Sequence, residues 1–320
     1  MKKIFILALA ASLAAVSCQE MGVYENNNEA NVTIKVGFPE TKAISDGLTA
    51  TTLIYEVYHV GGTDASPVYT LVTDETATLT NKTTSLNFTL MRDNKYVALF
   101  WAQSPNAPYV TDNLRAVDMN YADDPTVPNG NNEHRDAFCA AKEFTVSDTD
   151  ANNNLTCKLY RPFSQLNFVA TDYEQRDADN ITSLALTSSV VTISHLSPSY
   201  DVLTGIAAPA PTNPGDHVFD ANAVIEQEFD TDTKKTWISM NYVLLPDGAS
   251  TIEVEAEFVV NATYNTNNTI IHTINFPKTG VNAGKNYRTN IVGELFTEGG
   301  KVDITVDPAY SQPDNNLNVD

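Results

Sequence analysis

The residue with the clearest chemistry in this sequence is Cys18, because of what precedes it. Met1-Lys2-Lys3 is followed by an apolar run, residues 4–16, and then by Ser17 and Cys18. Two lysines, an apolar run too short to span a bilayer and small residues before a cysteine are typical of a bacterial lipoprotein signal. Cleavage before Cys18 would leave a thiol that can carry acyl chains and hold the protein on a membrane. The alternative is an ordinary secretory signal that Cys18 merely follows, and with either signal the protein is exported.

The other two cysteines are Cys139 and Cys157. In an oxidising compartment they can form a disulfide that closes a loop of about 18 residues and stabilises by about 3 kcal/mol in the chain-entropy model. The competing interpretation is two buried free thiols, because cysteine is among the most buried residue types. Neither cysteine has a partner at the spacing of metal ligands, so the sequence predicts no zinc site.

Other chemistry is weakly indicated. The five histidines are scattered, and the sequence has no nucleophile elbow and no phosphate-binding loop. Residues 148–152 imitate the first half of a calcium loop, but Asn153 replaces the required glycine and Leu159 stands where a bidentate glutamate belongs. A solvated hairpin turn is therefore the preferred interpretation. We expect no enzymatic activity, no metal and no cofactor.

The charge of the chain excludes one class of partner. It carries 19 Lys and Arg against 40 Asp and Glu, a net charge of −21, and loss of Lys2 and Lys3 with the signal would bring it to −23. So acidic a chain repels phosphate backbones, and we expect no nucleic-acid partner. No second apolar segment of about 18 residues follows the signal, so the N-terminal lipid would be the attachment to the membrane.

Most of the chain shows apolar residues alternating with polar ones, the pattern of half-buried strands. The alternating segments are short and are separated by Gly, Asn, Asp and Pro, and none has a sustained helical period. The sequence therefore predicts an all-β protein built from antiparallel sandwiches. These segments lie around residues 32–36, 53–57, 86–90, 96–100, 144–146, 155–159, 166–168, 184–186, 237–244, 252–260, 270–276 and 302–306. Trp101 and Trp237 lie in apolar strands, which favours core packing over stacking on a sugar.

The expected domain boundary is near Arg161-Pro162, where one strand ends and another begins. The predicted organisation is a signal peptide, a polar tether and two β-sandwich domains of ordinary size. These segments are residues 1–17, 18–30, 31–161 and 162–320.

Three stretches resemble the fimbrillin-type lipoproteins of Gram-negative anaerobes of the gut and mouth, a family of pilus subunits and their relatives. They are residues 96–103 (YVALFWAQ) with the later Arg135-Asp136-Ala137-Phe138, residues 159–166 (LYRPFSQL), and residues 286–297 (NYRTNIVGELFT). In the second stretch Ser164 stands where the family has alanine. Together with the signal, the resemblance spans nearly the whole chain.

The resemblance implies two tandem antiparallel β-sandwich domains, export as an outer-membrane lipoprotein and assembly into a surface pilus. In stalk subunits of the family, a protease cuts after a basic residue that follows the first strand, and a strand from the next subunit fills the opened groove. Here Val32, Ile34 and Val36 would lie in the displaced first strand, and Lys42 would be the processing site. The alternative is that Lys42 lies in a solvated loop and the strand stays in place.

The preferred functional prediction is a structural or accessory subunit of a cell-surface pilus. Its partners would be other pilus subunits, or copies of itself, joined by β-strand exchange, and the membrane through the lipid on Cys18. The alternative, from another class, is a surface lipoprotein that binds a glycan or a host ligand through loops at the end of a sandwich.

Overall fold

A computed structural model of the protein describes residues 28–38, 47–121, 128–171, 181–212, 216–220, 236–264, 268–294 and 302–307. The predicted signal, Cys18 and Lys42 lie outside these residues. Inside them the regular structure is β-strand, apart from two short 3-10 helices, η1 (Glu133–Arg135) and η2 (Asp150–Asn153). No helix in this part of the chain has the length and apolar character needed to cross a membrane. The prediction of an all-β fold is confirmed.

Two sheets in the first half of the chain share one core. Their strand orders are β3-β2-β5-β7 and β4-β1-β8. Val32 and Ile34 from one sheet, and Leu53 and Phe100 from the other, are fully buried in this core. The strands are β1 (Glu29–Gly37), β2 (Thr52–Thr63), β3 (Ser66–Thr78), β4 (Thr83–Met91), β5 (Lys95–Gln103), β7 (Ala137–Thr145) and β8 (Asn154–Lys158). Because β1 begins at Glu29, the end of the predicted tether belongs to this strand.

Two four-stranded sheets form the second half, with a second core between them. Their orders are β13-β10-β15-β16 and β14-β9-β17-β18. Phe168 and Phe258 meet edge to face in this core, with ring centroids 5.0 Å apart. The strands are β9 (Ser164–Ala170), β10 (Ile181–Ser194), β13 (His217–Asp220), β14 (Thr236–Val243), β15 (Thr251–Tyr264), β16 (Thr269–Asn282), β17 (Arg288–Gly293) and β18 (Val302–Asp307).

The two halves repeat one pairing pattern. In the first half, β1 pairs antiparallel with β4 and parallel with β8. In the second half, β9 pairs antiparallel with β14 and parallel with β17. The other strand pairs of the described residues are antiparallel. Each half is thus an antiparallel sandwich with one parallel pair beside its first strand.

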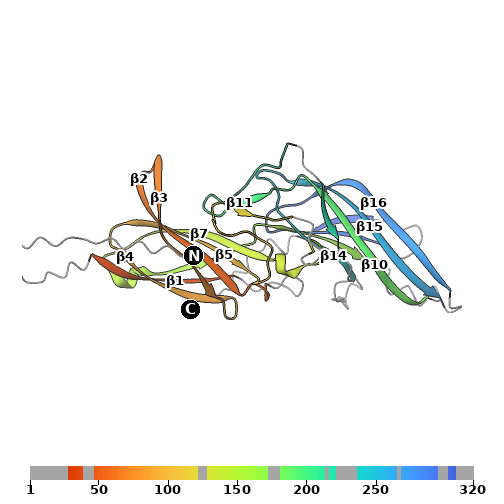
Figure 1. Ribbon diagram of the computed structural model, residues 1–320, viewed down its shortest axis with the longest axis horizontal. Coiled ribbons are helices and arrows are strands. Elements are labelled where there is room, and N and C mark those ends of the chain that lie inside the picture. Colours follow the sequence, from red (N-terminus) through yellow and green to blue (C-terminus); the bar gives the residue numbers. More distant parts are fainter. Residues whose placement is uncertain are drawn as a thin grey trace, which may run out of the picture.

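A small sheet and a third core join the halves, which lie end to end along the long axis of the molecule in Figure 1. The sheet has the order β12-β11-β6, so β6 (Val117–Asp118) of the first half pairs with β11 (Ser199–Asp201), and β11 pairs with β12 (Ile206–Ala207). Trp101 lies in this third core, fully buried beside Phe163 and Tyr200. The predicted boundary at residue 161 falls between β8 and β9, and the division into two domains stays a prediction.

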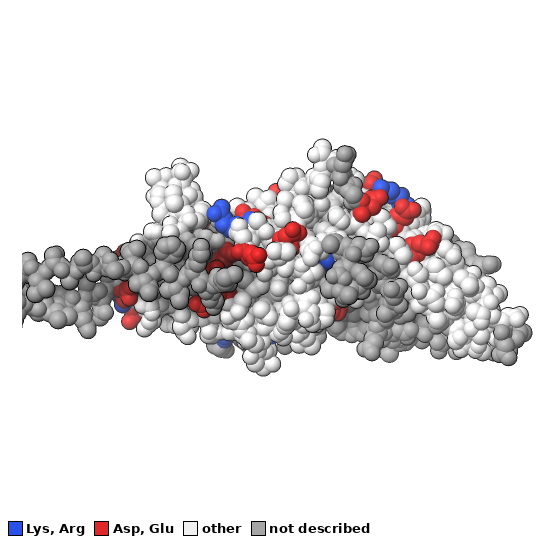
Figure 2. Space-filling view, in the orientation of Figure 1, with Lys and Arg blue, Asp and Glu red and all other residues white. Residues whose placement is uncertain are grey.

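The surface carries the acidic excess of the sequence. Figure 2 shows red acidic side chains along the length of the face that it draws, with fewer blue basic ones. This distribution fits a formal net charge of −21. A cluster of basic side chains on such a surface therefore stands out from its surroundings.

Candidate functional site

The strand β1 is the central strand of its sheet. It pairs with β4 along its whole length on one side, and with β8 from Thr33 to Gly37 on the other. The carbonyl of Gly37 also accepts a hydrogen bond from the amide of Leu159, at 2.8 Å. Because both edges of β1 are used, its removal would leave unpaired N–H and C=O groups on two strands that face one gap.

One face of β1 lies wholly in the core of the first half. Val32, Ile34 and Val36 are 0% exposed, whereas Thr33 and Lys35 between them are half-buried on the opposite face. This alternation follows from the period of two along a strand. The structure thus brings the three residues of the predicted first strand together on one buried face. Displacement of the strand stays a prediction.

The C-terminal end of β1 is held by a pair of stacked rings. The ring of Phe38 lies against that of Phe138 in β7, with centroids 4.0 Å apart and planes inclined by 7°. Gly47 fits against both rings with a φ of +75°, and a Cβ there would come within 2.7 Å of Phe38 and 2.8 Å of Phe138. Only glycine meets both the space and the backbone angle at this position. The chain that leads toward Lys42 therefore leaves β1 from a tightly packed end.

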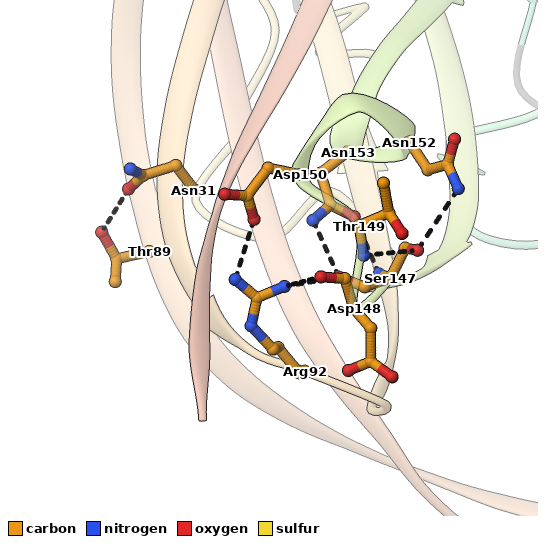
Figure 3. A network of polar contacts seen from close by, with 9 residues as sticks. All are labelled: Asn31, Thr89, Arg92, Ser147, Asp148, Thr149, Asp150, Asn152 and Asn153. Carbon is orange, nitrogen blue, oxygen red and sulfur yellow. Dashed lines mark hydrogen bonds and ion pairs between the residues drawn. The ribbon is translucent and has the colours of Figure 1, made fainter. Parts of the chain in front are cut away.

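At the opposite end of β1, Arg92 holds the loop between β7 and β8 (Figure 3). Its Nη1 donates to the carbonyl oxygens of Ser147 at 3.0 Å and Asp148 at 2.6 Å, and its Nη2 donates to Asp150 Oδ1 at 2.8 Å. The backbone amide of Arg92 donates to the carbonyl of Asn28, directly before β1, at 2.7 Å. One residue therefore connects the β4–β5 turn, the β7–β8 loop and the start of β1.

This β7–β8 loop is the segment whose sequence imitates a calcium loop. The Asp150 carboxylate pairs with the guanidinium of Arg92. Asn153 closes the turn, because its Oδ1 accepts from the Ser147 amide at 2.8 Å and its Nδ2 donates to the Ser147 carbonyl at 3.0 Å. These contacts are those of a loop closed by its own turn and by Arg92. Because β7 and β8 lie in different sheets, the loop is not the hairpin turn expected from the sequence. In the described ranges, no group of three or more His, Cys, Asp or Glu is placed to hold a metal ion.

Residues of the first two resembling stretches meet in a buried ion pair. Arg161 donates from Nε and Nη2 to the two carboxylate oxygens of Asp136, at 2.5 and 2.6 Å. The guanidinium also lies over the ring of Phe138, 4.4 Å from its centroid. The Arg161 side chain is 3% exposed and that of Asp136 is 0% exposed. If either partner of such a bidentate, desolvated pair is removed, the other is left as an uncompensated buried charge, which destabilises the fold.

The third resembling stretch is tied to the second across the parallel pair β9–β17. Arg288 donates from Nε to Gln165 Oε1 at 2.7 Å, and Asn167 donates from Nδ2 to Asn290 Oδ1 at 2.9 Å. Arg288, Gln165 and Asn167 are buried. These polar residues therefore bond one another across the two strands, although Asn167 Oδ1 is buried without a hydrogen-bond partner among the described residues.

Cys139 of β7 and Cys157 of β8 are free, buried thiols in the structure. Burial raises the pKa of Cys139 to about 12 and that of Cys157 to about 11. Both thiols are therefore protonated at neutral pH, and a protonated thiol is a poor nucleophile. A disulfide between them stays a prediction.

Sequence reasoning missed Arg92 and the Phe38–Phe138 stack. Arg92 stands in a polar turn, Arg92-Asp93-Asn94, where a lone arginine carries no pattern. Phe38 follows the alternating run of β1, which indicates a buried ring but not its partner. Arg92 and Asp150 are 58 residues apart in the sequence, and Phe138 lies still farther from Phe38. Contacts over such separations leave no local signal in a single sequence.

The fold defines an all-β protein of two joined sandwiches, and the family follows from the sequence. The chain belongs to the family described as "Family of unknown function (DUF6562)", whose model matches residues 24–320. No curated protein matches the chain. The resemblance to fimbrillin-type lipoproteins stays a prediction, because the matching family carries no described function.

Fimbrial proteins are among the solved structures to which the chain is similar. The tip fimbrial protein Mfa3 from Porphyromonas gingivalis, with a C-terminal truncation, has a TM-score of 0.43 and 10% identity, over 87% of this chain and 99% of that one. A fimbrial assembly protein from Parabacteroides distasonis ATCC 8503 has a TM-score of 0.40 and 12% identity, over 87% of this chain and 99% of that one.

Proposed function

We propose that this protein is a structural or accessory subunit of a cell-surface pilus, exported as a lipoprotein and assembled by β-strand exchange. The observation that carries the proposal is the placement of β1. This strand is central in its sheet, its Val32, Ile34 and Val36 side chains are fully buried, and Lys42 follows it closely in the sequence. A cut after Lys42 would separate β1 covalently from the rest of the sandwich.

Strand exchange needs a groove that accepts an incoming strand. Without β1, the groove would be bordered by β4 and β8 and floored by the apolar core of the first half. An extended segment with alternating apolar residues could restore the ladder hydrogen bonds and refill the core. β18 is a strand of this kind, since Val302, Ile304 and Val306 alternate in its sequence and it pairs with β17 alone among the described strands.

The proposal places the protein at the outer membrane or the cell surface. Acylated Cys18 would hold it there, and a single acyl chain binds a membrane only marginally, so stable attachment needs more than one. The proposal includes no enzymatic activity, no cofactor and no nucleic-acid partner. The alternative function, binding of a glycan or host ligand, has its own supporting observation in a cavity lined by lysines.

Mass spectrometry of the N-terminus tests the proposal. Fibres sheared from the cell surface should contain chains that begin at Ala43, whereas the membrane fraction should contain chains that begin at acylated Cys18. A Cys18→Ala variant should be exported without membrane attachment. If every chain in the sheared material begins at Cys18, strand exchange after a cut at Lys42 is rejected.

A further inference from the structure

A cavity lies where the two open sheet edges of the first half meet the second half. Its walls are β7 and β8, each at the edge of its sheet, together with the β11–β12 hairpin and the segment before β17. Its volume is about 570 Å³, within the range of small-ligand sites. It shares β8 with the groove of β1, but its lining contains no residue of β1 itself.

Three lysines line this cavity, Lys142 from β7, Lys158 from β8 and Lys285 from the loop before β17. None of the described residues that line it is acidic, although the chain has 40 acidic residues against 19 basic ones. The nearby Asp201 carboxylate is engaged by its own turn, since it accepts from the amide of Leu203 at 2.8 Å. The lining is therefore positive in a strongly negative protein.

The position of Lys285 is fixed by contacts at the cavity wall. Its Nζ donates to the hydroxyl of Tyr200 at 2.5 Å and to the carbonyl of Gly205 at 3.4 Å. A fixed ammonium group loses less conformational entropy when it binds an anion than a freely moving one does. Cys139 and Cys157 are also among the lining residues, and because burial raises the pKa of both thiols, they add no negative charge at neutral pH.

The remaining lining is polar and aromatic. Thr156 and Thr204 bring hydroxyl groups, and Tyr160, 42% exposed, brings an accessible ring. Hydroxyl groups can bond the hydroxyls of a sugar, and an exposed aromatic face can pack against the C–H face of a sugar ring. The lining thus combines lysines that can bind an acidic group with hydroxyl groups and an aromatic ring that can bind a sugar.

We propose that this cavity binds an acidic saccharide of one or two units, with the lysines holding its carboxylate or sulfate and Tyr160 packing against its ring. The site is present in the uncut protein, in which β1 holds its place beside β8, so binding there does not require strand exchange. It would give a surface protein a means to attach to acidic glycans.

A second explanation accounts for part of the cluster. Lysines on edge strands discourage pairing with other chains, and Lys142 and Lys158 both lie on edge strands. Lys285 belongs to neither strand, and its contacts with Tyr200 and Gly205 direct it to the same cavity. Edge protection therefore leaves Lys285 unexplained, and binding experiments separate the two explanations.

Calorimetric titration of the uncut mature chain tests the proposal. The probes are glucuronic acid and galactose 6-sulfate, with glucose, galactose and inorganic sulfate as controls. Both acidic sugars should bind, more weakly at high salt because screening weakens charge pairs. Lys285→Gln and Lys142→Gln should each weaken binding about tenfold, the loss expected for one charge-assisted hydrogen bond. Lys95→Gln removes a lysine that pairs with Glu143 outside the cavity and should leave binding unchanged.

Two further readouts locate the ligand. Bound acidic sugar should slow alkylation of Cys139 and Cys157, which line the cavity. Tyr160→Leu should weaken binding of the sugars and leave binding of inorganic sulfate unchanged. Equal binding of neutral and acidic sugars, or affinities that the two lysine variants leave unchanged, would overturn the proposal. If inorganic sulfate binds as tightly as galactose 6-sulfate, the cavity is a simple anion site and the proposal of a saccharide ligand is rejected.

Discussion

Asp136 is fully buried, and its carboxylate accepts two hydrogen bonds from Arg161. Asp136→Asn would keep the shape of the side chain but leave the arginine charge buried without its counter-ion. We expect a loss of about 3 to 5 kcal/mol in the free energy of unfolding, the usual cost of breaking a buried pair. Urea denaturation followed by circular dichroism measures this loss.

Asp150→Asn is the matched control for that substitution. It removes the same charge from a pair with Arg92, but the Asp150 side chain is 73% exposed. Exposed ion pairs contribute about 0 to 1 kcal/mol, so this variant should unfold close to the unmodified protein. If the two variants lose equal free energy of unfolding, the buried pair is no more stabilising than the exposed one, and the prediction is wrong.

The thiols give a second prediction at the scale of single residues. Because burial raises the pKa of Cys139 to about 12 and of Cys157 to about 11, few thiolates are present in the folded protein at about pH 8. Iodoacetamide should therefore label the native protein slowly, faster as the pH rises, and should label both cysteines rapidly in the unfolded, unreduced protein. Absence of label in the unfolded protein would establish the disulfide instead.

At the scale of elements, β1 is the strand on which the proposed function depends. Ile34→Ala should lower the free energy of unfolding by about 2 to 5 kcal/mol, because it removes buried methyl groups and leaves a cavity. Thr33→Ala, on the opposite face, loses a 2.9 Å hydrogen bond to Asn87 that is exposed, and should cost less than about 1 kcal/mol. Thermal unfolding of the two variants makes the comparison. Similar losses would show that β1 contributes little through its buried face.

Alternation predicted most strands, since a strand with one buried face has a period of two in its sequence. It found β1, β2, β4 and β5 with their buried residues. It missed β3, whose residues are all exposed or half-buried, so that no buried apolar face is left to detect. Val68, Leu71 and Val72 are apolar and yet exposed on this strand. Only partly buried residues of this edge strand, such as Tyr69 and Ala77, pack against a core, so β3 has no continuous hydrophobic period.

Of the candidate site, only the features within one segment of the sequence could be predicted. The alternation of Val32, Ile34 and Val36 marked β1, whereas its central place in the sheet depends on pairing with β4 and β8, far along the chain. The lysine cavity left no sequence signal at all, because Lys142, Lys158 and Lys285 come from separate segments. The tertiary fold alone brings them together.

At the scale of the whole molecule, the two halves are joined by an apolar core. Trp101 of the first half packs against Phe163 and Tyr200 of the second, and its indole N–H donates to Gln103 Oε1 at 2.8 Å. A contact of this kind resists independent motion of the halves more than a polar contact would. Changes in the first sandwich, such as the loss of β1, would therefore act on a molecule whose halves stay attached.

The last prediction concerns cleavage after Lys42. Burial of Val32, Ile34 and Val36 stabilises by about 1.5 to 3 kcal/mol for each side chain, so the uncut protein should be a stable monomer. Once cut, the chain can exchange β1 for a strand of another copy, and the opened groove should make it associate. Limited trypsin digestion followed by gel filtration tests this, with Lys42→Ala as the control that trypsin cannot cut at this position.

A peptide of residues 28–38 makes the test specific for the groove. Added in excess, it should occupy the groove and keep the trimmed protein monomeric. The same peptide with Val32→Ser, Ile34→Ser and Val36→Ser keeps the backbone but loses the side chains that fill the core, and it should not prevent association. Trimmed protein that stays strictly monomeric after release of β1, with no peptide present, would reject strand exchange at this site and leave ligand binding as the function to pursue.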